Sequence, residues 1–153
     1  MENLDKADKQ ILNLLQQDSS LTIKEIAAQM DLSTTPVFER IKKLEKASYI
    51  RKYVALLNAK KIGRKLTVFI NVSLQKHSKD AVEKFVSAVY CFEEVQELHH
   101  VSGDSDFLVK VLLDDMEAYN DFVLNKLGLI RNTSNVRSQF ALSNRKYSTE
   151  VFL

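Results

Sequence analysis

TIKEIAAQMDLSTTPVFERIKKLEKASYIRKY, residues 22–53, predicts two short helices joined by a tight turn. A Thr-x-x-Glu capping box begins the first helix at Thr22, where two side chains satisfy backbone N–H groups that lack a partner inside the helix. Ser33 is a good N-cap for the second helix, and Pro36 is tolerated in a first helical turn. Because Pro36 has no N–H group, we expect the Ser33 hydroxyl to accept a hydrogen bond from the N–H group of Thr35.

The second helix, from about residue 34 to residue 47, separates its apolar and polar side chains. At 100° per residue, Val37, Ile41 and Leu44 share one narrow face and should pack inward. The polar and basic side chains then point outward, which is typical of a helix-turn-helix whose second helix enters the major groove of DNA. The outward residues are Thr35, Glu39, Lys42, Lys43 and Lys46.

Positive charge is concentrated in the middle of the chain. Residues 39–65 contain ten Lys and Arg residues and two acids, whereas residues 1–38 contain three bases and six acids. Residues 66–153 contain nine bases and twelve acids. The formal net charge of +2 therefore conceals a basic block of the kind that contacts phosphate groups. A solvated helix face is the alternative, but it does not explain this clustering, so we predict double-stranded DNA as a partner.

The candidate DNA contacts lie on the second helix and just after it. Glu39 is suited to accept from a cytosine amino group, and Lys42 to donate to guanine. Phe38 has two possible roles, contact with a thymine methyl group or packing against a neighbouring helix. Arg40 lies beside the buried stripe, which favours a phosphate or an intradomain carboxylate over a base edge. Arg51 should contact phosphate. The full predicted set is Ser33, Thr34, Thr35, Phe38, Glu39, Arg40, Lys42, Lys43, Arg51 and Lys52.

Length and composition fit a soluble protein of one or two small domains. The chain has 153 residues, of which 45% are hydrophobic and 27% charged. It has neither a basic-then-apolar N-terminal stretch nor a run of 18 apolar residues, so we expect no signal peptide, no transmembrane helix and no membrane partner. Cys91 is the only cysteine, which suits a reducing cytosol. We expect a cytoplasmic protein associated with the nucleoid.

The pattern before residue 66 predicts three helices between residues 5 and 47 and a strand or wing at residues 49–57. Asp5 is a good N-cap for the first helix, which should bury Ile11, Leu12 and Leu15. Gly63 marks the flexible point of a hinge. We therefore place a helix-turn-helix DNA-binding domain at residues 1–57, the hinge at residues 58–65, and a second domain, for oligomerisation, at residues 66–153.

After residue 65 the hydrophobic period predicts the order βαββαβ, the ferredoxin-like plan with two helices on one face of an antiparallel sheet. The fold class is thus α+β, with a winged helix-turn-helix first. The face without helices is moderately apolar, so we expect a homodimer that covers it. The strands fall at 66–74, 95–101, 107–113 and 135–142, and the helices run from a Ser78 cap to about 90 and from an Asp114 or Asp115 cap to about 127. The second of these helices should bury Met116, Tyr119, Phe122, Val123 and Leu127.

Three stretches of this chain together resemble the Lrp/AsnC family, the feast/famine transcriptional regulators. They are LDKADKQILNLLQQD, which matches LDxxDxxIL, LSTTPVFERIKKLEKASYIRKYVALLN, which matches LSxxxVxxRxxxLExxGxIxxYxAxL, and HHVSGDSDFLVKVLLDDMEAY, which matches a GDxD hairpin followed by D-M-x-x-Y. The resemblance implies a sequence-specific transcriptional regulator that responds to an amino acid or a related small molecule. It also implies that residues 66–153 bind this effector and that the homodimer assembles further to an octamer. One departure is Ser48, where the family has glycine; a left-handed conformation there costs serine about 1 kcal/mol.

The turn Gly103–Asp106 is the candidate effector site. From residue types alone it is equally a hairpin turn made of good turn formers. The resemblance implies that the turn lines an amino-acid site between dimers. Backbone N–H groups suit an α-carboxylate and a carboxylate suits an α-ammonium group, for which Asp106 is the candidate. The predicted site comprises His100, Val101, Ser102, Gly103, Asp104 and Asp106, with Thr133 and Asn135 approaching from the far side.

Two alternatives share this architecture, a tetrapyrrole decarboxylase-like enzyme and an effector-independent DNA-organising protein. The basic second helix argues against the enzyme, which has no use for one. The sequence has no nucleophile motif, phosphate loop or dinucleotide fingerprint. His99 and His100 lie on opposite faces of a strand and cannot chelate one metal together. We therefore predict no catalytic residues, no metal and no cofactor.

Overall fold

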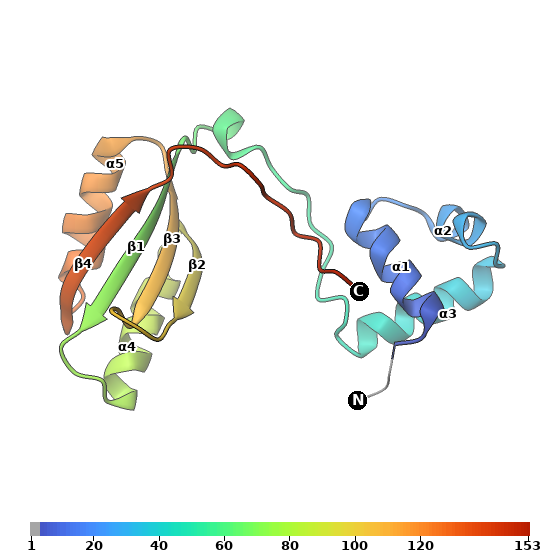
Figure 1. The fold of residues 1–153 in the computed structure, drawn as a ribbon, viewed down its shortest axis with the longest axis horizontal. Coiled ribbons are helices and arrows are strands. Elements are labelled where there is room, and N and C mark those ends of the chain that lie inside the picture. Colours follow the sequence, from blue (N-terminus) through green and yellow to red (C-terminus); the bar gives the residue numbers. More distant parts are fainter. Residues whose placement is uncertain (1–3) are drawn as a thin grey trace. The chain divides into compact units, whose positions relative to one another are not determined.

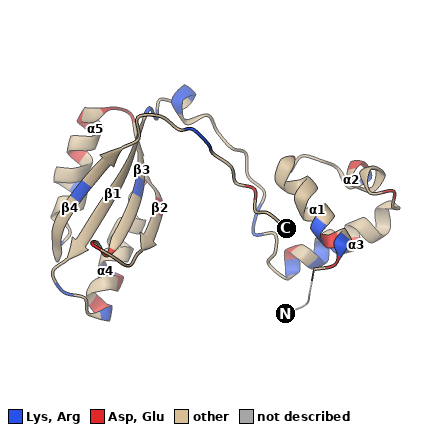
Figure 2. Ribbon diagram, viewed as in Figure 1, with Lys and Arg blue, Asp and Glu red and all other residues tan. Residues whose placement is uncertain are grey.

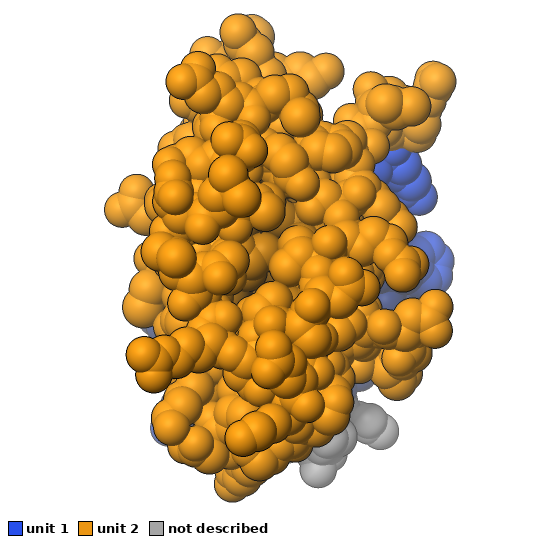
Figure 3. Space-filling view, turned by 90° about the vertical axis from the view of Figure 1, so that its left-hand side faces the viewer, with its two compact units in different colours: residues 1–56, 146–153 blue, residues 57–145 orange. Residues whose placement is uncertain are grey.

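The computed structural model describes residues 4–153 and divides the chain into two compact units (Figure 3). Unit 2 is Leu57–Arg145, and unit 1 combines the residues up to Leu56 with Lys146–Leu153. The predicted second domain ran to residue 153, and in the structure its last eight residues group with unit 1. The tail groups with unit 1 because the Gln16 side chain holds the backbone of Val151 at both N–H and C=O, at 2.6 and 3.1 Å.

Unit 1 contains α1 (Lys6–Gln17), α2 (Ile23–Gln29) and α3 (Thr34–Lys46) (Figure 1). The predicted caps are confirmed for the first two helices. Asp5 begins α1 in a reciprocal capping box with Asp8, and Thr22 begins α2 in the predicted box with Glu25. The core between the helices consists of Ile11, Leu12, Ile26, Ala27, Val37, Ile41 and Leu44, with Leu15 only partly buried.

The N-terminal end of α3 differs from its prediction, whereas its C-terminal end has the left-handed Ser48 considered from the sequence. Ser33 occupies the N-cap position, but its hydroxyl makes no cap hydrogen bond, so the predicted bond from Thr35 is wrong. A Ser cap ordinarily accepts from the second or third helical N–H group, and Pro36 removes the third. At the other end Ser48 adopts the left-handed conformation, with φ 61°. Tyr49 N–H donates to the Leu44 carbonyl group at 3.0 Å, as in a Schellman motif.

Residues 49–57, predicted as a strand or wing, contain neither helix nor strand. A strand needs a neighbour for its N–H and C=O groups, and the described part of unit 1 contains no second strand to supply one. The predicted hinge instead contains a short 3₁₀ helix, η1 (Ala59–Ile62), which ends at Gly63 with φ 93°. Gly63 is thus a fixed left-handed cap in this structure, a conformation that glycine adopts without a steric cost.

Unit 2 confirms the predicted ferredoxin-like order. Its sheet has the antiparallel order β2-β3-β1-β4, and α4 and α5 cover one face (Figure 1). Ser78 caps α4 and Asp115 caps α5. The elements are β1 (Leu66–Leu74), α4 (Lys79–Tyr90), β2 (Val95–His100), β3 (Phe107–Leu113), α5 (Met116–Asp121) and β4 (Thr133–Phe140).

The last helix ends earlier than predicted and β4 begins two residues earlier. After α5 the chain continues as a π-helical turn, η2 (Phe122–Lys126), and a 3₁₀ turn, η3 (Leu127–Leu129). A Cβ atom on Gly128 would lie 2.8 Å from the Val123 carbonyl oxygen, so this close turn requires glycine. Met116 was predicted to be buried but is 56% exposed, because it is the first residue of a short helix.

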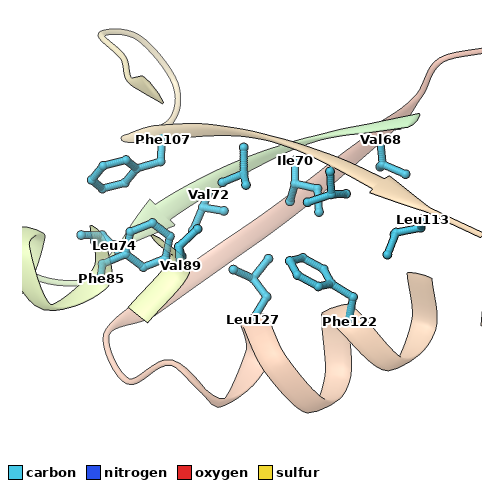
Figure 4. Packing of buried hydrophobic residues seen from close by; sticks show 12 residues of the cluster. Val68, Ile70, Val72, Leu74, Phe85, Val89, Phe107, Leu113, Phe122 and Leu127 are labelled. Atoms are coloured by element: carbon cyan, nitrogen blue, oxygen red, sulfur yellow. The ribbon is translucent and has the colours of Figure 1, made fainter. Parts of the chain in front are cut away.

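The core of unit 2 lies between the sheet and the helices (Figure 4). Phe107 from β3 and Phe85 from α4 have ring centroids 4.7 Å apart, and Phe122 and Leu127 fill the other end. Every second residue of β1 points into this layer, namely Val68, Ile70, Val72 and Leu74. The alternate residues of β1 therefore face the side of the sheet that carries no helix.

Candidate nucleic-acid interface and sheet pocket

The outer face of α3 is exposed as the helical period predicts. Val37 and Leu44 are buried against α1 and α2, whereas Thr35, Glu39 and Lys42 are exposed. Lys and Arg residues lie along α3 and the segment that follows it, including η1 (Figure 2). The other predicted contacts on the helix and after it, Ser33, Thr34, Lys43, Arg51 and Lys52, are also exposed. This surface can reach phosphate and base edges together.

A continuous strip of side chains occupies one side of this outer face. Phe38 is 41% exposed, and the Lys42 Nζ atom lies 5.8 Å from its ring centroid. Lys42 also forms an ion pair of 2.8 Å with Glu45, one helical turn further on. Of the two roles predicted for Phe38, the structure therefore favours a surface role, with the ring beneath a lysine, over packing against another helix.

Arg40 is held within the unit by two carboxylates. Its Nη1 atom lies 2.6 Å from Asp5 Oδ2 and 2.6 Å from Asp8 Oδ1, and Asp8 is only 7% exposed. Hydrogen bonds from the Asp8 backbone and then from Arg40 lower the pKa of Asp5. The predicted place of Arg40 among the DNA contacts is therefore corrected in favour of the intradomain carboxylate, because its charge is already neutralised.

The carboxylate of Asp106, the predicted partner of an α-ammonium group, already has partners within unit 2. Its Oδ2 atom accepts from the Leu74 N–H group at 2.7 Å, and its Oδ1 atom lies 3.1 Å from His77 Nδ1. The Asp106 backbone also donates to the Val72 carbonyl group at 3.0 Å. This carboxylate ties the end of β1 to the turn after β2, which is a structural task.

A pocket of about 390 Å³ opens on the face of the sheet that carries no helix. Among the predicted effector residues it is lined by Val101, Ser102, Asp104 and Asn135, but not by His100, Gly103, Asp106 or Thr133. His100 lies elsewhere because its ring stacks on Phe107, 4.9 Å away, toward the helices. The remaining lining residues are Asn71, Ser73, Ser105, Leu108, Arg137 and Gln139.

The prediction included Asn135 of β4 but missed Arg137 and Gln139. Asn135, Arg137 and Gln139 line it at alternate positions, as residues on one face of a strand must. Within residues 4–153 no carboxylate forms an ion pair with Arg137, so the pocket combines an available guanidinium group with the carboxylate residue Asp104. The polar alternation of β4 was the sequence signal for this set.

Comparison with known families gives two matches that together span nearly the whole chain. Residues 4–51 match a winged helix-turn-helix DNA-binding model, and residues 67–151 match the Lrp/AsnC ligand-binding domain. The chain belongs to the Lrp/AsnC family of transcriptional regulators. It is 36% identical to the leucine-responsive regulatory protein of Klebsiella pneumoniae and 35% identical to that of Escherichia coli K12, in each case over 99% of this chain and 93% of the relative.

Solved structures of Lrp/AsnC regulators agree with this assignment. A transcriptional regulator of Neisseria meningitidis in complex with L-Met has a TM-score of 0.93 and 36% identity, over 97% of this chain and 96% of that one. An AsnC-family regulator from Agrobacterium tumefaciens has a TM-score of 0.92 and 39% identity, over 96% and 95%. The main prediction, a DNA-binding transcriptional regulator, is thereby favoured over the decarboxylase and the DNA-organising protein.

The sheet face around the pocket is more polar than predicted for this Lrp/AsnC chain. Its apolar side chains are Phe69, Val101, Leu108 and Leu112, all half-buried, and they lie among polar pocket residues. On the same face Lys110 pairs with Glu97 at 2.5 Å. The expectation of a moderately apolar face is therefore corrected, because the alternating polar residues of β1 and β4 share it.

Other site types receive no support from the described residues. Within residues 4–153 no three His, Cys, Asp or Glu side chains gather as a metal ion requires. No helix in that part of the chain combines the length and the apolar character needed to cross a bilayer.

Proposed function

We propose that this Lrp/AsnC regulator places the outward face of α3 in the major groove and that an amino acid bound in the sheet pocket changes its affinity for DNA. The carrying observation is the pocket, which offers a guanidinium group and a carboxylate residue in a volume of about 390 Å³. A free amino acid carries the two complementary charges. The L-Met complex of the Neisseria regulator supports this class of ligand.

The DNA half of the proposal is supported by the charge and exposure of α3. Glu39 and Lys42 lie outward, where a recognition helix contacts base edges. Arg51 and Lys52 follow the helix and are suited to phosphate, which positions a protein without specifying sequence.

In the pocket, Arg137 is proposed to bind the α-carboxylate, since a guanidinium group forms paired hydrogen bonds with a carboxylate. Asp104 replaces Asp106 as the proposed partner of the α-ammonium group, because the Asp106 oxygens already have partners. Asn135 and Gln139 add amide groups that can donate or accept. The side chain of the ligand is left to contact Val101 and Leu108.

We further propose a homodimer that assembles to an octamer and acts in the cytoplasm at the nucleoid. Exposed apolar residues outside the sheet face support association. Leu56 is 60% exposed, Leu57 71% and Leu142 99%. These exposed apolar side chains are available for burial by a second subunit.

The DNA half is tested by comparing Lys42→Ala with Arg51→Ala. Lys42→Ala should weaken binding to the preferred duplex more than to random duplex, and Arg51→Ala should weaken both nearly equally. The preferred duplex is the one that the wild-type protein enriches from a randomised pool, and gel shift measures both. The wild-type log–log salt slope should be about −5 to −9. A slope shallower than about −2, or equal effects of the two changes, contradicts the proposed surface.

The effector half is tested by calorimetric titration with L-methionine and L-leucine, followed by the other amino acids. Arg137→Gln and Asp104→Asn should each lower affinity about tenfold or more, because a charge-assisted hydrogen bond contributes about 1.5–3 kcal/mol. Asp106→Asn is the matched control: it removes one charge from the same turn and keeps an oxygen for the Leu74 N–H group. If only Asp106→Asn loses affinity, the assignment within the pocket is wrong.

A further inference from the structure

Glu45 links the outward face of α3, which is proposed to contact DNA, to residues 49–57. We call these residues, which follow the helix, the connecting segment. Its Oε2 atom lies 2.8 Å from Lys42 Nζ, and its Oε1 atom accepts a hydrogen bond of 3.1 Å from the Tyr53 hydroxyl group. Both oxygens of one carboxylate are thus engaged, one by a side chain of the recognition helix and one by a residue beyond it. All three residues belong to unit 1.

The arrangement follows from the helical period and the turn after α3. Phe38, Lys42 and Glu45 are spaced four and three residues apart, so they form one row along the helix. The left-handed turn at Ser48 reverses the chain and brings Tyr53 back to the end of that row. The row therefore runs from the DNA-facing beginning of α3 to the start of the connecting segment.

The Tyr53 hydroxyl group is a donor throughout the physiological pH range. Partial burial of the side chain, which is 46% exposed, and then the nearby Glu45 carboxylate raise the pKa of Tyr53 to about 12. The hydrogen bond from Lys42 lowers the pKa of Glu45, to which the Tyr53 hydroxyl adds. Glu45 is therefore ionised and Tyr53 protonated, so the bond between them is charge-assisted.

We propose that Tyr53 is a positioning residue for DNA recognition: through Glu45 it fixes Lys42 on the outer face of α3 and so couples the connecting segment to the base-contacting side chain. The proposal rests on the proposed role of Lys42 at a base edge. A lysine ammonium group has three donors, so the bond to Glu45 leaves donors for guanine. Fixing the side chain beforehand reduces the ordering cost of binding.

The coupling predicts a change in specificity rather than in overall affinity. Without the Tyr53 hydroxyl group, Glu45 keeps its charge and Lys42 keeps its own, so the electrostatic attraction to phosphate is unchanged. Only the orientation of Lys42 is lost. A movement of the connecting segment that breaks the Tyr53–Glu45 bond would have the same result, which makes base recognition sensitive to that segment.

The test is Tyr53→Phe, measured by gel shift on the enriched duplex and on a scrambled duplex of equal length. The ratio of the two affinities should fall about three- to tenfold, the equivalent of one hydrogen bond, while affinity for the scrambled duplex stays within about twofold. Tyr90→Phe, at an 83% exposed position, is the control and should change neither. Equal losses on both duplexes overturn the proposal, because they indicate a structural role.

A double-mutant cycle separates this inference from the proposed function. In a Lys42→Ala background Tyr53→Phe should cause no further loss of discrimination, because Tyr53 acts through Lys42. A further loss overturns the coupling. If Lys42→Ala itself leaves discrimination intact, the proposed base contact fails as well.

A second experiment tests the bond between Tyr53 and Glu45 directly. Glu45→Gln should lower the pKa of Tyr53, measured by the absorbance of tyrosinate in a pH titration. An unchanged titration excludes the Tyr53–Glu45 bond.

Discussion

The two units bury different kinds of side chain. In unit 2 the core contains Phe85, Phe107 and Phe122 between a sheet and its helices, whereas the buried hydrophobic residues in the described part of unit 1 are all aliphatic. Unit 1 supplements them with a carboxylate that is 7% exposed, Asp8, paired with Arg40. A small three-helix unit has little apolar area to bury, so caps and ion pairs carry more of its stability. Unit 2 adds ring packing to caps and ion pairs of its own.

Phe107→Ala should have the largest effect, because it removes a fully buried ring that contacts Phe85 and His100. We expect unit 2 to lose about 3–5 kcal/mol. Hydrogen exchange followed by mass spectrometry should show lost protection in β1 and β3 and retained protection in α1 to α3. Tyr90→Ala, at an exposed site, should leave the hydrogen-exchange protection of both units unchanged. Equal loss in the two units would mean that they unfold together.

Asp8→Asn should have an intermediate effect, confined to unit 1. It removes the buried charge that faces Arg40 and weakens the capping box with Asp5, so we expect a loss of about 1–3 kcal/mol. The matched control is Asp80→Asn, because the side chains of Asp80 and its ion-pair partner Lys84 are each 76% exposed. This substitution should lower the free energy of unfolding by less than about 0.5 kcal/mol. Urea unfolding measures both, and similar costs would remove the distinction between the units.

Ser48→Gly and Asn132→Gly should give the smallest effects, with opposite signs. Both residues have positive φ, 61° and 81°. Glycine at 48 should stabilise unit 1 by about 0.5–1 kcal/mol, because it relieves the strain. At 132 the same change should destabilise unit 2, since the Asn132 side chain exchanges two hydrogen bonds with the Lys76 backbone, at 2.8 and 2.9 Å. Thermal unfolding measures both variants. A lower melting temperature for Ser48→Gly would contradict the proposal that the backbone is strained at Ser48.

Local patterns in the sequence predicted most of the secondary structure. Capping residues such as Thr22 and Ser78 lie where helices begin, and the apolar stripe of α3 is buried as its period required. These features succeed because a helix or strand is decided by neighbours a few residues apart. The same reasoning predicted the βαββαβ order, and family resemblance supplied the regulatory role.

The sequence by itself determined the elements of this protein, the basic helix and the family, while the tertiary structure decided which charged groups are available. Arg40 and Asp106 look like ligands in the sequence, but residues distant along the chain bind them in the fold. The return of the tail to Gln16 and the lack of a strand at residues 49–57 likewise depend on residues distant along the chain. The physical reason is that hydrogen bonds and ion pairs depend on distances of about 3 Å, which sequence spacing fixes only within one helix or strand.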